Sequence, residues 1–151
     1  MNPNSHFKDL LSAFDRCGVK YLVVGGYAVM RYTEPRFTKD LDLWVEASEE
    51  NAPRVFRALP EFGAPLAGVR ADDFAKADLV YQLGVAPTRI DVLTSITGVD
   101  FADAWQRRSE GDFGGVQAQF IGLEDLVTNK RATGRTMDLA DCERLEEARN
   151  H

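Results

Sequence analysis

The sequence predicts a mixed α/β fold, α+β in its details, in which a small mixed β-sheet of about four to five strands is flanked by helices. Short apolar runs rich in β-branched residues alternate with stretches whose apolar residues recur at helical spacing. Glycines and prolines separate these runs, without an internal repeat or a linker. The composition, with 44% hydrophobic and 28% charged residues, is that of an ordinary globular protein. We therefore expect residues 1–151 to form a single domain.

The first half of the chain predicts helices and strands in alternation. Helical segments are indicated by apolar spacing and by a serine in a capping position, and strands by continuous apolar runs. The expected elements are a helix carrying Phe7, Leu10, Leu11 and Phe14 and closed by Gly18, a strand over 19–26, a short helix over 27–33, a strand over 40–46, and a helix that Ser48 caps, with Glu49 and Glu50 in its first turn and Val55, Phe56 and Leu59 on its apolar face.

The second half begins with a segment rich in glycine and proline, over residues 60–78, for which we expect little regular structure beyond a turn of helix near Asp72 to Ala75. Two β-rich runs of hairpin spacing come next, and helical patterns occupy the C-terminal part. The expected elements are strands over 79–84 and 89–94 joined by residues 85–88, a helix over 100–108, a strand over 115–122, and helices over 123–133 and 137–149 separated by Gly134.

Charge and residue usage exclude several classes of function. The net charge of −6 argues against extended binding of a DNA or RNA duplex, although it allows a local basic patch over one RNA end. The two histidines, His6 and His151, lie at the extremities, which argues against a Ser-His-Asp triad, a Cys-His dyad or a zinc site. Cys17 and Cys142 suggest no disulfide framework. Without a signal-like N-terminus or a long apolar run, we expect a cytoplasmic protein that has no contact with a membrane.

Gly25 and Gly26 lie where the predicted strand passes into a helix. Glycines at such a turn allow the backbone to approach a phosphate, and the free amides at the helix start favour an anion. A glycine pair is a weak signal on its own, and a tight turn that needs only a positive φ is then the better explanation.

Asp40 and Asp42 are a stronger signal. Their spacing of two places both on the same face of a strand, about 7 Å apart, from where both carboxylates can reach one hydrated Mg²⁺ or a pair of ions. The alternative is a strand whose acids simply face solvent. Trp44 shares the side of the aspartates, so we expect that face to be partly covered, while the opposite face carries Leu41, Leu43 and Val45.

Asp91 is a third acid within a predicted strand, between Ile90 and Val92. A carboxylate flanked by β-branched residues is unusual and is a candidate for the same site. The structural alternative is an ion pair with Arg89 on the same strand. The case for a site therefore depends on the combination of glycines and acids.

This combination resembles the nucleotidyltransferase fold of the polymerase-beta type superfamily. A Gly-Gly turn, thirteen residues, an Asp-x-Asp motif and a later strand aspartate match the pattern of the family, and "PRFTKDLDLWV" resembles its Thr-x-Asp-x-Asp form. The runs "PTRIDVLTSITGVDFADAW" and "LEDLVTNKRATGRTMDLADCERL" resemble small stand-alone bacterial members related to abortive-infection and toxin–antitoxin nucleotidyltransferases. The resemblance extends from about Tyr21 to Leu145 and is weakest around residues 60–78. Gly26 departs from the serine of many relatives, so only backbone donors are expected there.

The resemblance implies a fold with C-terminal helices and an Mg²⁺-dependent or Mn²⁺-dependent transfer of a nucleoside monophosphate from a nucleoside triphosphate, such as ATP, to a hydroxyl. It implies that Asp40, Asp42 and Asp91 are the catalytic and metal-binding acids and that Gly25 and Gly26 cradle the phosphates. Further candidates for nucleotide contact are Thr38, Lys39, Arg36, Lys130 and Arg135; for the charged ones, a solvated surface charge is the alternative.

Three functions compete on the sequence. The first is a nucleotidyltransferase that acts on an RNA end, tRNA especially, or on a partner protein in a toxin–antitoxin setting. The second is a small-molecule nucleotidyltransferase of the lincosamide or aminoglycoside type. The third is a non-catalytic module that binds a nucleotide or a partner. The acidic net charge counts against RNA, the second half of the chain favours the first function over the second, and the intact set of acids places the third last.

Overall fold

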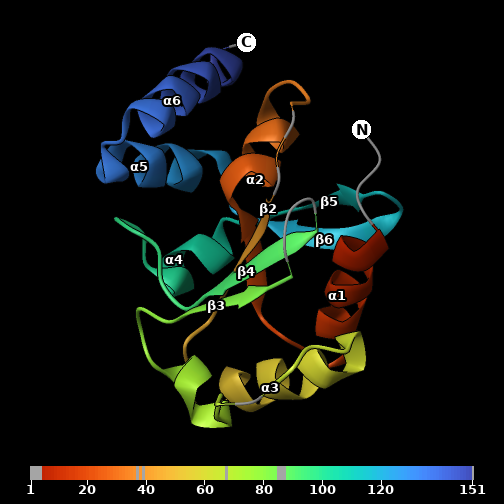
Figure 1. Cartoon of the computed structure of the whole chain (residues 1–151). Helices are drawn as coiled ribbons and strands as arrows, with labels where there is room; N and C mark the ends of the chain where they lie inside the picture. Colours follow the sequence, from red (N-terminus) through yellow and green to blue (C-terminus); the bar gives the residue numbers. More distant parts are fainter. Residues whose placement is uncertain (1–4, 37, 39, 67, 85–87, 151) are drawn as a thin grey trace.

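A six-stranded mixed sheet forms the centre of the computed structural model, which describes residues 5–36, 38, 40–66, 68–84 and 88–150 (Figure 1). The strand order is β3-β4-β2-β1-β6-β5. The strands are β1 Tyr21–Val24, β2 Asp40–Val45, β3 Val80–Leu83, β4 Arg89–Leu93, β5 Ser109–Phe113 and β6 Val116–Phe120. The helices are α1 Ser5–Arg16, α2 Gly25–Tyr32, α3 Asn51–Phe62, α4 Phe101–Gln106, α5 Leu123–Thr133 and α6 Thr136–Arg149, with a short 3-10 helix at Ala71–Ala75.

The centre of the sheet mixes the two strand directions. Strands β1 and β2 pair antiparallel, whereas β2 with β4 and β1 with β6 pair parallel. The two outer pairs, β3 with β4 and β5 with β6, are antiparallel. As a result, the end of β1 and the beginnings of β2 and β4 meet at one edge of the sheet, which is where the sequence placed its candidate residues.

Each face of the sheet carries its own hydrophobic core. One core joins α1 and α3 to the alternate strand residues Leu41, Leu43 and Val45, all fully buried. The other core joins Trp44 and β1 residues to α2, α4, α5 and α6. In Figure 1, α5 and α6 lie together beside α2, on the opposite side of the molecule from α3. The alternation within β2 therefore assigns the aspartates and Trp44 to the face covered by the C-terminal helices.

Most of the expected elements are present, and the differences have local causes. The count of about four to five strands is too low, because β5 is a polar edge strand in which only Phe113 is buried. Helix α3 begins at Asn51, so Glu49 and Glu50 lie in the preceding turn, and the Ser48 hydroxyl accepts a hydrogen bond from the Asn51 amide.

Two further segments complete the comparison with the expected elements. Helix α3 continues through Pro60 to Phe62, beyond the expected start of the loop, whereas the turn of helix near 72–75 is confirmed. The expected pairing of β3 and β4 is also confirmed, and residues 85–87 of their connection lie outside the described residues. No helix within the described ranges combines the length and the apolar character needed to cross a membrane.

Candidate active site

The turn between β1 and α2 is made of the predicted glycine pair, which lies against the segment that carries the acids. Gly25 has a φ of +69°, and a Cβ at this position would overlap the carboxylate of Asp42. A Cβ on Gly26 would lie 2.8 Å from the Oγ1 of Thr38. Val24, at the start of α2, makes no side-chain cap hydrogen bond, so the first amides of the helix are available to an anion. The turn thus needs glycine both for its backbone conformation and for close approach.

The three acids lie on the adjacent parallel strands β2 and β4. Asp42 and Asp91 are direct partners in the register of β2 and β4, and Asp40 is opposite Arg89. Neighbouring strands lie about 4.8 Å apart, so side chains in register on one face reach a common position. Trp44 is 2% exposed, which confirms that the aspartate face is partly covered.

Arg89 lies between two of these acids. Its Nε and one terminal nitrogen donate hydrogen bonds of 3.1 and 3.2 Å to the two carboxylate oxygens of Asp91. The same Nε lies 3.9 Å from Oδ1 of Asp40. The ion pair that the sequence left open as the structural alternative for Asp91 is therefore present, inside the candidate site.

The surplus of negative charge acts chiefly on Asp42. Burial, as the largest cause, and the charges of Asp91 and Asp40 together raise the pKa of Asp42 to about 7, although Lys130 and Arg89 oppose the rise. A carboxylate with such a pKa is stabilised by any additional cation next to it. The electrostatics of the site therefore favour the binding of a cation.

Lys130 approaches the site from α5 and is held by two acids of α6. Its Nζ donates a hydrogen bond of 3.0 Å to Asp138 and lies 3.4 Å from Asp141. Lys130 is 8% exposed and lines, with Gly25 and Asp42, a cleft of about 210 Å³. The alternative of a solvated helix charge is therefore wrong for Lys130.

Arg135 lines the same cleft and binds Asp138 at 2.8 Å, but its side chain is 77% exposed. Asp138 and Asp141, which hold these cations, were not expected from the sequence. Both acids are buried, at 5% and 2% exposure. Their spacing of three on a helix, which places both on one face, was the signal that could have indicated them.

Arg36 connects this network to the glycine turn. Its guanidinium binds both oxygens of Asp141, at 2.5 and 3.1 Å, and lies 3.7 Å from the position of a Cβ on Gly26. Thr38 lies beside Gly26, and its hydroxyl is 3.5 Å from the carbonyl oxygen of Asp40. Lys39, the remaining candidate for nucleotide contact, lies outside the described residues.

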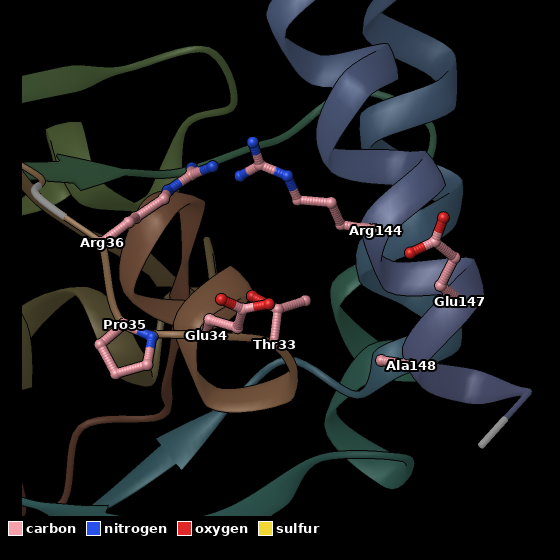
Figure 2. Close-up of a pocket in the computed structure, with 7 residues that line it drawn as sticks. All are labelled: Thr33, Glu34, Pro35, Arg36, Arg144, Glu147 and Ala148. Atoms are coloured by element: carbon pink, nitrogen blue, oxygen red, sulfur yellow. The ribbon is translucent and has the colours of Figure 1, made fainter.

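A larger crevice of about 480 Å³ opens on the far side of Arg36, between the α2–β2 connection and α6. Figure 2 shows Arg36 and Arg144 pointing toward one another across it, with Glu34 and Glu147 on its two walls. The side chains of Glu34, Arg144 and Glu147 make no ion pair with other residues in the described ranges. The crevice therefore presents unpaired charges of both signs.

The donor set fits a hard divalent cation. Carboxylate oxygens are the ligands that Mg²⁺ and Mn²⁺ prefer, and burial together with the charges of Asp91 and Asp40 raises the pKa of Asp42, so that an added cation would stabilise its ionised form. Among the described residues, no three His, Cys, Asp or Glu side chains already stand together as a metal cluster. Arg89, between Asp40 and Asp91, occupies part of the space that such a cluster would need.

Comparison with known proteins agrees with this geometry at the level of the fold. The sequence matches no protein-family model and no curated protein. The structure resembles the lincomycin-bound lincosamide antibiotic adenylyltransferase LnuA, with a TM-score of 0.62 and 16% identity over 97% of this chain and 98% of that one. A candidate nucleotidyltransferase from Thermotoga maritima gives a TM-score of 0.60 and 17% identity over 99% and 96% of the two chains.

The antibiotic-resistance factor ANT(2'')-Ia gives a TM-score of 0.58 and 16% identity over 97% of this chain and 88% of that chain. At these identities the likeness concerns the path of the backbone, and it extends over nearly the whole chain in each case. The chain has the nucleotidyltransferase fold.

Proposed function

We propose that the protein is a nucleotidyltransferase that moves a nucleoside monophosphate from a nucleoside triphosphate to a hydroxyl acceptor. The observation that carries the proposal is the register of Asp42 and Asp91 beside an uncapped glycine turn. Asp42 lines one cleft together with Gly25 and Lys130, and Asp91 lies in register with Asp42 on the neighbouring strand. Phosphoryl transfer needs this combination of charge neutralisation and positioning more than it needs a covalent intermediate.

Different residues would bind the nucleoside triphosphate and the acceptor. Asp40 and Asp42 would hold the Mg²⁺ or Mn²⁺ that carries the triphosphate, and the amides of Gly25 and Gly26 would bind its terminal phosphates. The bound ion would neutralise phosphate charge and acidify the acceptor hydroxyl. Lys130, which Asp138 and Asp141 hold at the cleft, is a candidate for contact with the nucleotide. Thr38, Lys39 and Arg135 are further candidates.

Asp91 would act on the acceptor side. The acceptor oxygen forms a bond to the α-phosphorus while the bond from that phosphorus to the oxygen bridging the β-phosphate breaks. Pyrophosphate leaves with the electron pair, and the proton of the acceptor hydroxyl passes to Asp91. Asp91 would also serve as a ligand on this side of the site, since it is in register with Asp42.

The first candidate acceptor is an RNA end, tRNA especially, or a partner protein in a toxin–antitoxin setting. It is supported by the sequence resemblance of the second half of the chain to nucleotidyltransferases of that kind. In this setting the acceptor hydroxyl would be brought to the cleft by a surface of the partner, because the cleft of about 210 Å³ is small.

The second candidate acceptor is a small polar molecule, and the pairing of the cations near the cleft favours it. Arg36, Lys130 and Arg89 each bind an acid of this chain, which leaves little free positive charge for a phosphodiester chain. The crevice beside Arg36 offers unpaired charges of both signs. The likeness to LnuA and ANT(2'')-Ia over nearly the whole chain supports the same class of acceptor.

One experiment tests both the transfer and the acceptor. The protein is incubated with Mg²⁺ or Mn²⁺ and each of the four α-phosphate-labelled nucleoside triphosphates, in parallel with total cellular RNA, with co-expressed protein, and with a panel of lincosamides and aminoglycosides. Label in tRNA-sized species or in a protein supports the first acceptor class, and label in a small molecule supports the second. If no acceptor is labelled and calorimetry detects no triphosphate binding with any divalent ion, the protein is not a nucleotidyltransferase.

A further inference from the structure

Arg89 differs from the other cations around the cleft in the acids on which it depends. Lys130 and Arg135 are bound by Asp138, and Lys130 and Arg36 by Asp141, neither of which belongs to the strand acids. Within the described residues, the only acids within ion-pair distance of Arg89 are Asp40 and Asp91. A cation that enters among the strand acids therefore competes with Arg89 and leaves the other positive charges in place.

We propose that Arg89 closes the metal site in the absence of nucleotide by holding Asp40 and Asp91, and that it is released to the triphosphate when the ion binds. The proposal rests on the function proposed above. The guanidinium makes two hydrogen bonds to Asp91 and approaches Asp40 across the strand pair, so two of the three acids are engaged by an internal cation. The bidentate geometry is the strong form of an arginine–carboxylate pair.

Release of Arg89 follows from charge and from its position. A divalent ion among the acids repels a guanidinium that lies between two of them, and it takes over the carboxylate oxygens that Arg89 binds. The side chain of Arg89 is 37% exposed, compared with 13% for Asp91, so the guanidinium borders solvent and can leave the carboxylates without crossing the core. Arginine suits phosphate oxygens as well as it suits carboxylates, and the triphosphate supplies the new partner at the same moment.

The consequence is cooperative binding of metal and nucleotide. Metal alone must break the ion pairs of Arg89, whereas metal with a triphosphate gives Arg89 new partners. Each ligand therefore increases the affinity for the other by the same factor. Removal of the guanidinium abolishes this part of the coupling, because the acids are then open to the ion from the beginning.

The test measures Mn²⁺ binding, by electron paramagnetic resonance of the free ion, to the wild-type protein, Arg89→Gln and the control Arg149→Gln. The control loses the same charge from an exposed pair with Glu124 on the C-terminal helices. Without nucleotide, Arg89→Gln should bind Mn²⁺ about three- to tenfold more tightly than the wild type, the effect of one or two partly exposed ion pairs. With a non-hydrolysable ATP analogue, the gain in Mn²⁺ affinity should be smaller in Arg89→Gln than in the other two proteins.

Arg89→Lys serves as a second variant in case the glutamine variant does not fold, since it keeps the charge but cannot bind two carboxylate oxygens in parallel. It should bind Mn²⁺ alone with an affinity between those of the wild type and Arg89→Gln. Equal Mn²⁺ affinities in all variants, with nucleotide coupling unchanged, would overturn the role of Arg89 and leave the proposed function intact. Failure of every variant to bind either Mn²⁺ or nucleotide would overturn the proposed function and this inference with it.

Discussion

Replacement of Asp42 by asparagine should stabilise the metal-free protein while it weakens the binding of Mg²⁺-triphosphate. Burial, together with Asp91 and Asp40, raises the pKa of Asp42 from 3.8 to about 7. The folded protein therefore holds the proton of Asp42 over a pH range in which the unfolded chain has released it. Because the folded state binds more protons there, its stability falls as the pH rises from about 4 to about 7.

The size of this effect follows from the pKa. Each pKa unit corresponds to about 1.4 kcal/mol, so at about pH 8 the ionised Asp42 destabilises the metal-free fold by up to about 4 kcal/mol. Asparagine has nearly the same shape and carries no charge. We expect the free energy of unfolding of Asp42→Asn to exceed that of the wild type by about 2–4 kcal/mol at pH 8, and the Tm to be roughly 5–15 °C higher. The difference should shrink toward zero below about pH 4.

The assay is thermal and urea unfolding in EDTA between about pH 4 and pH 8, followed by titration calorimetry with Mg²⁺ and a triphosphate. Asp9→Asn is the matched control, because it removes an exposed acid of α1 on the opposite side of the sheet and should change stability by less than about 0.5 kcal/mol. In the presence of metal and nucleotide the order should reverse, because the wild type gains stability through binding that Asp42→Asn lacks. A metal-free Asp42→Asn that is no more stable than the wild type at pH 8 would refute the electrostatic account of the site.

Three further changes test other parts of the site. Asp91→Asn should leave triphosphate affinity nearly intact in calorimetry while single-turnover rates fall by orders of magnitude, the pattern of an interaction made in the transition state; an active variant would remove Asp91 from the site. Gly25→Ala should destabilise the protein more than Gly134→Ala does, since both glycines have φ +69° but only a Cβ at position 25 would meet a neighbouring side chain. Chemical unfolding should show a loss of about 1 kcal/mol in the free energy of unfolding for Gly134→Ala. Equal losses in the two variants would contradict the close approach of Gly25 to Asp42. Asp141→Asn should lower the free energy of unfolding by about 2–4 kcal/mol, because the Asp141 side chain is 3% exposed and binds two cations. Glu124→Gln, in an exposed pair, should lower it by less than about 1 kcal/mol. Equal losses of Tm in the two variants would show that the buried ion pairs stabilise the fold no more than an exposed pair does.

The sequence by itself determined the order of the main elements and the positions of the glycine turn and the acids. Period-two alternation in β2 separates Leu41 and Leu43 from Asp42 and Trp44, so the two faces of this strand can be assigned without coordinates. The glycine pair and the acid spacing are likewise local patterns, and the structure contains them where the sequence predicts them. Strand β5 was missed because a polar edge strand has no periodic apolar signal, and its pairing with β6 defines it.

Only the tertiary structure decided which charges meet. The parallel register of β2 and β4 puts Asp42 opposite Asp91, although 48 residues separate the two in the sequence. The packing of α6 against α5 buries Asp138 beside Lys130. As a result, Lys130 lines the cleft, although the sequence alone allowed it to be a surface charge. Such contacts depend on how elements distant in the sequence are placed, and electrostatic energies fall with distance and rise with burial. The types of group in the site were therefore visible in the sequence, whereas their pairing and their pKa values arise from the fold.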